Sequence, residues 1–300
     1  MRRILALALL LIGAAPAAAS ERAIAPGPAF NVTAHSGYMA WDGGSDSSRE
    51  LWHDGTVTPL RVGEAYWGVA LGSDAARRPA ATFTNCDPGP ANCVVRQRLL
   101  RSGQERVLYR DGGGGMAPAA AMHRGTLAIA AGGGGRPVWL SVRRPGDRRL
   151  RRIATIQAPG LFLSVGAGHV AYRTTGDGTE LLRVEDLASG RNRAFAVDDT
   201  YDSDCRCGVP IATARNPLLA GRYLHWLEER FTTAGYRTTR IARAPVDAAA
   251  PRIEYYATEQ PAQSYALRGS RIVYTAEPGG VVEVRDPAWQ RSGERIPART

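Results

Sequence analysis

The densest cluster of potential ligands in this sequence is acidic. Asp198, Asp199, Asp202 and Asp204 fall within one short stretch. Carboxylate oxygens at alternating positions are the ligands that calcium prefers, so these four residues are candidate calcium ligands. The stretch lacks the glycine and the closing glutamate of an EF-hand loop, and a solvated acidic loop is the favoured interpretation. No cofactor is expected, and calcium is the one that this stretch leaves open.

Four cysteines form two pairs along the chain. Cys86 and Cys93 flank a loop rich in proline and glycine, and we expect a disulfide to close this loop. Cys205 and Cys207 are separated by one residue, and a bond between them would be strained. Pairing between the two clusters is the alternative. The C-x6-C and C-x-C spacings are unusual for zinc, so the cysteines predict disulfides and an oxidising compartment.

The other residues that could do chemistry give no complete site. The five histidines stand at different offsets along the expected strands, and only His35 and His123 lie near the end of a first strand. A histidine metal site would need matched positions. The G-x-S-x-G motif of serine hydrolases is absent. Paired carboxylates from distant loops could still hydrolyse a glycosidic bond, and one sequence does not identify them.

The N-terminus predicts export. Arg2 and Arg3 precede an apolar run over residues 4–12, and small residues with Ala17 and Ala19 follow before Ser20. This order is typical of a secretory signal peptide, which we expect to span residues 1–19. The apolar run is shorter than the roughly 20 residues that span a bilayer, and no later stretch is long enough. We therefore expect a secreted or periplasmic protein without an integral membrane segment after cleavage.

The charge is strongly basic and carried entirely by arginine. The formal net charge is +10, and none of the 38 basic residues is lysine. Acidic and basic residues are interspersed except in one run, which contains Arg143, Arg144, Arg148, Arg149, Arg151 and Arg152. Export argues against nucleic acid, so a partner attracted by this charge would be an anionic cell-surface polymer, lipid head groups or an envelope protein. A solvated arginine-rich surface is the favoured interpretation of the charge itself.

A repeat organises the chain. Short apolar or alternating runs recur at intervals of roughly 45 residues, separated by turns of glycine and aspartate. The best copy has runs at 161–165, 168–173, 180–187 and 193–197, which is one blade of four strands. Equivalent second-strand positions recur six times, and five of them are aromatic. These markers are Trp41, Phe83, Ile129, Tyr172, Trp226 and Tyr274.

The regular recurrence of the aromatic markers predicts core packing between blades rather than a ring of ligand-stacking groups. With long helical periodicity absent, the chain is predicted to be all-β, a six-bladed β-propeller with four antiparallel strands per blade over residues 20–300. Five or seven blades are the alternatives.

The pattern of apolar strand, Gly/Asp turn and a strand ending such as Val184-Glu185-Asp186-Leu187 resembles the TolB-like and WD40-like six-bladed propellers. The resemblance implies architecture and no particular residue roles. Two functions fit this architecture. The first is a non-enzymatic binding or protein-interaction module. The alternative is a secreted hydrolase or lyase acting on a polysaccharide-type substrate in the axial funnel. Enzymatic activity is left open, with binding favoured because catalytic motifs are missing.

Overall fold

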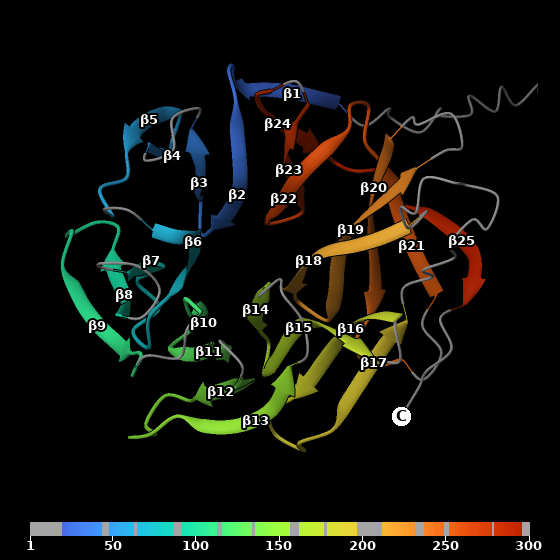
Figure 1. Cartoon of the computed structure of the whole chain (residues 1–300). Helices are drawn as coiled ribbons and strands as arrows, with labels where there is room; N and C mark the ends of the chain where they lie inside the picture. Colours follow the sequence, from blue (N-terminus) through green and yellow to red (C-terminus); the bar gives the residue numbers. More distant parts are fainter. Residues whose placement is uncertain are drawn as a thin grey trace, which may run out of the picture.

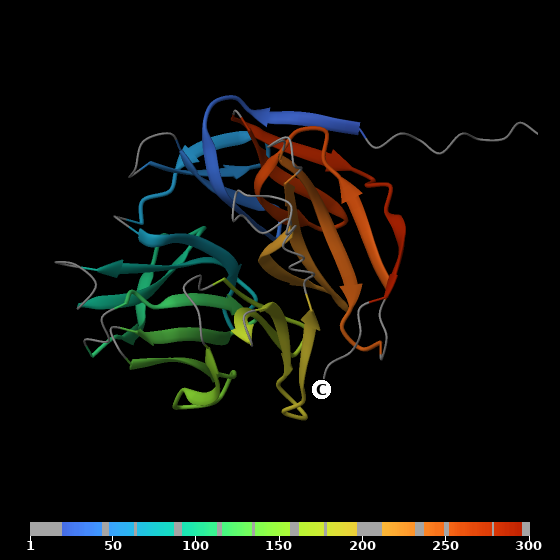
Figure 2. The same ribbon diagram turned by 45° about the vertical axis from the view of Figure 1, so that its right-hand side comes forward.

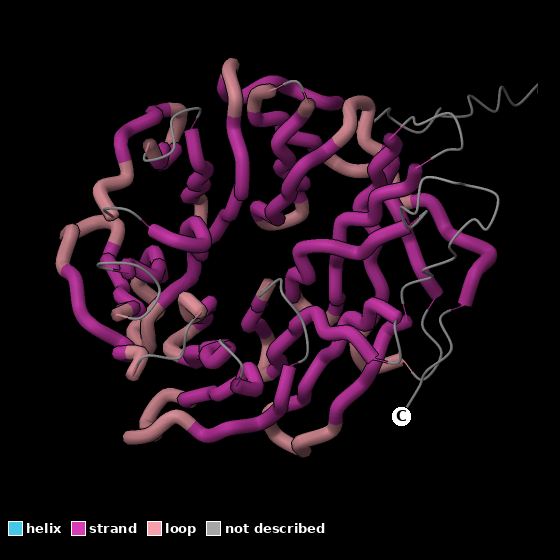
Figure 3. Tube along the Cα trace, in the orientation of Figure 1, coloured by secondary structure: helices cyan, strands magenta, loops and turns pink. Residues whose placement is uncertain are grey.

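The computed structural model describes most of the chain as β-strands around a central axis. The described residues are 20–43, 48–62, 65–86, 92–112, 116–133, 136–156, 162–176, 179–196, 212–231, 237–248, 252–277 and 279–295. Residues 1–19, the acidic stretch at 198–204, and Cys205 and Cys207 lie outside these ranges. Every regular element within them is a strand, as Figure 3 shows. None of the described residues belongs to a helix long and apolar enough to cross a membrane.

Six antiparallel sheets are arranged as the blades of a propeller, which confirms the predicted fold class and blade number (Figure 1). Blade one consists of β2 (Ala29–His35), β3 (Tyr38–Gly43), β4 (Arg49–His53) and β5 (Thr56–Pro59). Blade two consists of β6 (Ala65–Ser73), β7 (Pro79–Cys86), β8 (Cys93–Leu99) and β9 (Glu105–Arg110). Blade three consists of β10 (Ala119–His123), β11 (Thr126–Gly133), β12 (Arg136–Arg143) and β13 (Arg151–Ile156).

The second half of the chain forms the remaining blades. Blade four consists of β14 (Leu163–Gly166), β15 (His169–Gly176), β16 (Thr179–Asp186) and β17 (Asn192–Ala196). Blade five begins with β18 (Ala212–Ala220), β19 (Tyr223–Phe231), β20 (Arg237–Pro245) and β21 (Arg252–Ala257). Blade six contains β22 (Ala262–Arg268), β23 (Arg271–Ala276) and β24 (Val281–Arg285). The first strand of every blade lies innermost, around the axis (Figure 1).

The N-terminal strand closes the ring. β1 (Ser20–Ala25) pairs antiparallel with β24 and supplies the outer strand of blade six (Figure 2). The carboxylate of Glu21 on this strand accepts hydrogen bonds from the hydroxyls of Tyr256 in blade five and Tyr274 in blade six. Burial, and after it the Glu21 carboxylate, raises the pKa of both tyrosines, so their hydroxyls remain hydrogen-bond donors at neutral pH. Glu21 therefore fastens the N-terminal strand to blades five and six, where the ring closes.

One blade departs from the expected four strands. β25 (Gln290–Arg295) does not join blade six, from which it follows in sequence, but pairs with β21 as a fifth strand of blade five (Figure 1). Since β1 already occupies the outer edge of β24, the C-terminal strand adds to the neighbouring free edge instead.

The recurring aromatic residues are core, as predicted. The side chains of Trp41, Phe83, Tyr172, Trp226 and Tyr274 are all buried, at 4% exposure or less. Each occupies the second strand of its blade, where it packs in the clusters of small apolar and aliphatic residues within and between blades. Burying a large aromatic side chain contributes about 2–3 kcal/mol, so the repeated position stabilises each blade and excludes a ring of stacking ligands.

Side-chain hydroxyl groups join neighbouring blades. The Oγ of Ser264 accepts the amide of Val32, and the Oγ1 of Thr33 accepts the amide of Leu71. The other such bridges are Ser73 to the Arg124 amide, Ser164 to the Leu219 amide, and Thr239 to the Ala262 amide. Each bridge satisfies a backbone N–H that faces another sheet, where no ladder partner exists. These serine and threonine side chains therefore hold the blades in place.

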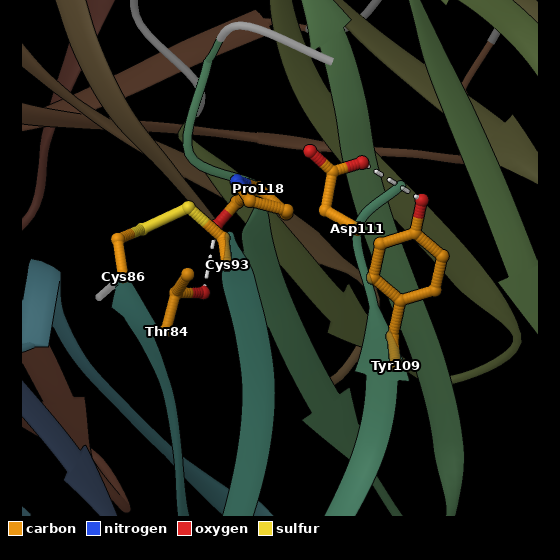
Figure 4. The surroundings of a disulfide bond; sticks show 6 residues. All are labelled: Thr84, Cys86, Cys93, Tyr109, Asp111 and Pro118. Atoms are coloured by element: carbon orange, nitrogen blue, oxygen red, sulfur yellow. Dashed lines mark hydrogen bonds between the residues drawn. A yellow bond between two sulfur atoms is a disulfide. The ribbon is translucent and has the colours of Figure 1, made fainter. Parts of the chain in front are cut away.

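The expected disulfide between Cys86 and Cys93 is present. The two residues face each other at the end of the β7–β8 pair, with Cα atoms 4.1 Å apart (Figure 4). Beside the bond, Thr84 donates to the carbonyl of Pro118 at 2.7 Å and ties blade two to blade three (Figure 4). A disulfide of this kind fits an oxidising compartment.

Candidate functional site

The central channel opens differently at its two ends. At the C-terminal ends of the inner strands lies a cavity of about 590 Å³, here called the wide mouth, to which all six blades contribute. At the opposite end the cavity measures about 160 Å³ and is lined by residues such as Asn31, Phe162 and Asn216. Ligand pockets usually measure about 300–1,000 Å³. The wide mouth therefore has the size of a binding site, and the narrow end does not.

Apolar side chains and backbone form most of the wall of the wide mouth. Ala70 and Leu71 come from blade two, Leu163 and Val165 from blade four, and Leu267 from blade six. The inner strands approach one another closely here because some of their positions are glycine. A Cβ at Gly72 would overlap the carbonyl oxygen of Met122, so only glycine allows blades two and three to meet at this point.

Three polar side chains converge at the rim of the wide mouth. The rings of His35 and His123 meet edge to face, with centroids 5.5 Å apart, and Arg124 follows His123 directly. Burial, and then the proximity of His123 and Arg124, lowers the pKa of His35 to about 4. Burial and Arg124 also lower the pKa of His123. The fixed positive charge at the rim is thus Arg124, which is exposed beside imidazoles that resist protonation.

Tight turns place these side chains. Ser36 and Gly37 follow β2 with φ of 47° and 84°, and Arg124 and Gly125 follow β10 with φ of 49° and 78°. Two consecutive residues with positive φ form the turn that matches the twist of a two-residue hairpin. Each turn therefore fixes the last residue of its inner strand, a histidine in both blades, at the same height along the axis.

The residues singled out in the sequence have different outcomes. His35 and His123, the two histidines at the ends of first strands, do come together. Among the described residues no group of three or more histidine, cysteine or acidic side chains could hold a metal ion. The candidate calcium ligands Asp198, Asp199, Asp202 and Asp204, and the cysteines Cys205 and Cys207, lie outside the described ranges.

Within the described part of the chain, neither end of the channel is lined by a carboxylate. The hydroxyl of Ser164, although it faces the channel, accepts the amide of Leu219 at 2.9 Å. The paired carboxylates of glycoside hydrolysis are therefore not found at the channel in these residues.

Sequence reasoning missed Arg124 as a rim residue. The available signal was its place in an Arg-Gly turn directly after an inner strand that ends in histidine. Sequence reasoning did single out the arginine run of residues 143–152. That run lies away from the channel, beside the turn between β12 and β13.

No protein-family model matches the chain, and no curated protein matches its sequence significantly. Solved structures do match. TolB from Acinetobacter baumannii aligns with a TM-score of 0.53 at 8% identity, over 85% of this chain and 62% of that one. A putative TolB from Agrobacterium tumefaciens aligns with a TM-score of 0.45 at 11% identity, over 79% and 87% of the two chains.

The propeller domain of the Trilobed protease from Pyrococcus furiosus aligns with a TM-score of 0.46 at 6% identity, over 88% and 94% of the two chains. The chain spans less than two thirds of the length of the Acinetobacter TolB. At these identities the likeness concerns the fold, and the chain has the six-bladed propeller architecture that TolB also has.

Proposed function

We propose that this chain is an exported, non-catalytic interaction module that holds a segment of an envelope protein in its wide mouth. The observation that carries the proposal is the cavity of about 590 Å³ built by all six blades, apolar in its walls and polar at one side of its rim. An apolar cavity with a few convergent polar groups is the usual form of a ligand site.

The chemistry of the mouth indicates what the segment should carry. The walls would accept an apolar side chain, since Ala70, Leu71 and Leu163 leave no buried polar group there to satisfy. At the rim, Arg124 would pair with a carboxylate of the same segment. His35 is neutral above about pH 4, so it would offer hydrogen bonds without adding charge. The proposed ligand is thus an extended protein segment with an apolar residue next to an acidic one.

Export supports the choice of an envelope partner. The order of basic, apolar and small residues at the N-terminus favours secretion. The Cys86–Cys93 disulfide is of the kind that persists in oxidising compartments.

The test compares three variants in a binding assay with envelope proteins at low and high salt. Ala70→Phe narrows the channel, because Ala70 lines both of its ends. Arg124→Gln removes the rim charge. Arg77→Gln is the matched control, since Arg77 is also exposed and also has positive φ, at 60°, but does not line the mouth.

We expect the wild-type chain to retain one protein saturably at high salt. Ala70→Phe should abolish this retention, Arg124→Gln should weaken it about tenfold, and Arg77→Gln should leave it unchanged. Melting temperatures and the intact disulfide would show that the variants fold. Retention by a folded Ala70→Phe variant equal to that of wild type would refute the proposal. So would turnover of a substrate that a change at the channel abolishes.

A further inference from the structure

An arginine-rich groove lies between blades three and four. It has a volume of about 820 Å³ and lies between the turn that joins β12 to β13 and the turn that follows β16. The pairing of Leu127 with Arg143 and of His169 with Asp186 places both turns on the same face of the propeller as the wide mouth. Five arginines line this groove, here called the arginine groove: Arg144, Arg148, Arg149, Arg151 and Arg152.

These arginines are exposed and form no ion pair with any described acidic side chain. Arg152 places its guanidinium over the ring of Trp139, with Cζ 3.3 Å from the centroid, which fixes its position without neutralising it. An arginine cluster without partners carries a repulsive cost, which a bound anion would remove.

The three carboxylates in the groove are already engaged by the protein. Asp147 accepts the amide of Arg144 and closes its turn. Asp186 accepts the amides of Ala188 and Ser189, which lowers the pKa of its carboxyl. Glu185 accepts the side chain of Asn192 at 2.7 Å. The five guanidinium groups outnumber these three carboxylates, so the lining of the groove carries a net positive charge.

The lining also indicates which anion fits. One guanidinium group can donate two parallel hydrogen bonds to two oxygens of a carboxylate or phosphate. Proteins that bind single-stranded nucleic acid add aromatic faces on which bases stack. The described lining of the arginine groove contains no aromatic residue, and Arg152 covers the nearby Trp139. The groove is therefore suited to a polymer with repeated negative charges and no bases.

We propose that the arginine groove binds a linear anionic polysaccharide along the rim of the propeller. This site is separate from the wide mouth. The chain would then hold a protein segment at the axis and a surface polymer at the edge of the same face, which would place the bound protein against the envelope.

The experiment measures binding of polygalacturonate, a carboxylate polymer, to the chain expressed from residues 1–300 and purified with its disulfide intact. Polyphosphate tests phosphate as the anion, and dextran serves as the neutral polymer. The groove variant carries Arg148→Gln, Arg149→Gln and Arg151→Gln. The matched control carries Arg61→Gln, Arg101→Gln and Arg110→Gln, three exposed arginines of blade two and the turn before it, so both variants lose the same charge.

We expect saturable binding of polygalacturonate and none of dextran. The groove variant should bind about tenfold more weakly, and the control less than twofold. The dependence of affinity on salt should also be shallower for the groove variant, because fewer counterions are released on binding.

Two results would overturn the proposal. Equal weakening in both triple variants would show that only the general charge is sensed, and absence of binding to polygalacturonate would exclude this ligand class, whether or not polyphosphate binds. Retention of the envelope protein by the groove variant separates this outcome from the proposed function, which depends on the wide mouth. A groove variant that loses the protein partner but keeps the polymer would contradict the separate assignment of the two sites.

Discussion

Two regions of this propeller use arginine differently, in ion pairs in one region and as exposed charges in the other. In blades five and six, Arg240, Arg243 and Arg268 each pair with a glutamate and lie over an aromatic ring. In the arginine groove of blades three and four, five arginines face solvent without a carboxylate partner among the described residues. Arginine therefore forms structural ion pairs in one region, and in the other it is an exposed cation without a carboxylate partner among the described residues.

The paired arginines show how a structural guanidinium is held. Arg240 donates to both oxygens of Glu228, at 2.9 Å and 2.7 Å, and its Cζ lies 4.6 Å from the centroid of Tyr255. The Cζ of Arg243 lies 4.7 Å from the ring centroid of Tyr223 and 4.0 Å from that of Trp289, and the guanidinium donates to Glu254. A planar guanidinium can use its edge for a carboxylate and its face for a ring at the same time, which lysine does not.

The largest effect should follow from removing the most buried acid of this set. Glu283 is 3% exposed and lies within 4 Å of three guanidinium groups, those of Arg268, Arg271 and Arg285. We expect Glu283→Gln to lower the free energy of unfolding by about 3 kcal/mol, because it leaves partly buried cations without their partner. Urea unfolding at neutral pH measures the change.

The control for this prediction is Glu105→Gln. Glu105 pairs with Arg98 on the surface, where the side chains of Arg98 and Glu105 are 27% and 34% exposed, and the expected loss is below about 1 kcal/mol. Similar losses in the two variants would mean that burial does not separate structural from surface ion pairs in this chain.

A second effect arises where a paired arginine lies beside a buried histidine. Burial, and then the charge of Arg243, lowers the pKa of His225 from 6.5 to about 3. The unfolded chain therefore binds a proton at a pH at which the folded chain does not, and stability falls as the pH drops from about 6.5 toward 3. At pH 5 the loss due to His225 should be about 2 kcal/mol.

The measurement is urea unfolding of wild type and His225→Phe at pH 7 and pH 5. Phenylalanine keeps an aromatic ring beside Trp289 and has no proton to gain. The difference in stability between the two pH values should therefore be about 2 kcal/mol smaller in the variant. An equal dependence on pH in the two proteins would place the acid sensitivity elsewhere.

Much of the architecture could be predicted because its signals are local. Alternating apolar residues and Gly/Asp turns mark single strands and hairpins, and the expected strand at 180–187 appears as β16 at Thr179–Asp186. The recurring position of Trp41 and Tyr274 identified the core of the blades. Cys86 and Cys93 could be paired from sequence because they flank a single short loop.

The features that sequence reasoning missed depend on contacts between distant segments. Nothing near Ser20 or Gln290 indicates that β1 completes blade six and that β25 joins blade five. To predict the contact of His35 with His123, one would have to know how high two inner strands lie along a common axis. The roles of the arginines are hidden for the same reason, since the glutamate that pairs with Arg240 lies on the neighbouring strand, opposite it in register.

The smallest effect on stability is expected in the arginine groove, whose arginines are not paired with described carboxylates. Replacing Arg148, Arg149 and Arg151 by glutamine should change the free energy of unfolding by less than about 0.5 kcal/mol, because exposed side chains without partners contribute little to the folded state. Arg240→Gln, a single change, should cost more, since it leaves Glu228 buried without its guanidinium. Thermal unfolding of the two variants compares them directly. A triple variant as unstable as Arg240→Gln would mean that the arginine groove stabilises the fold. A triple variant as stable as wild type would mean that folding does not depend on these arginines, which is what a binding role predicts.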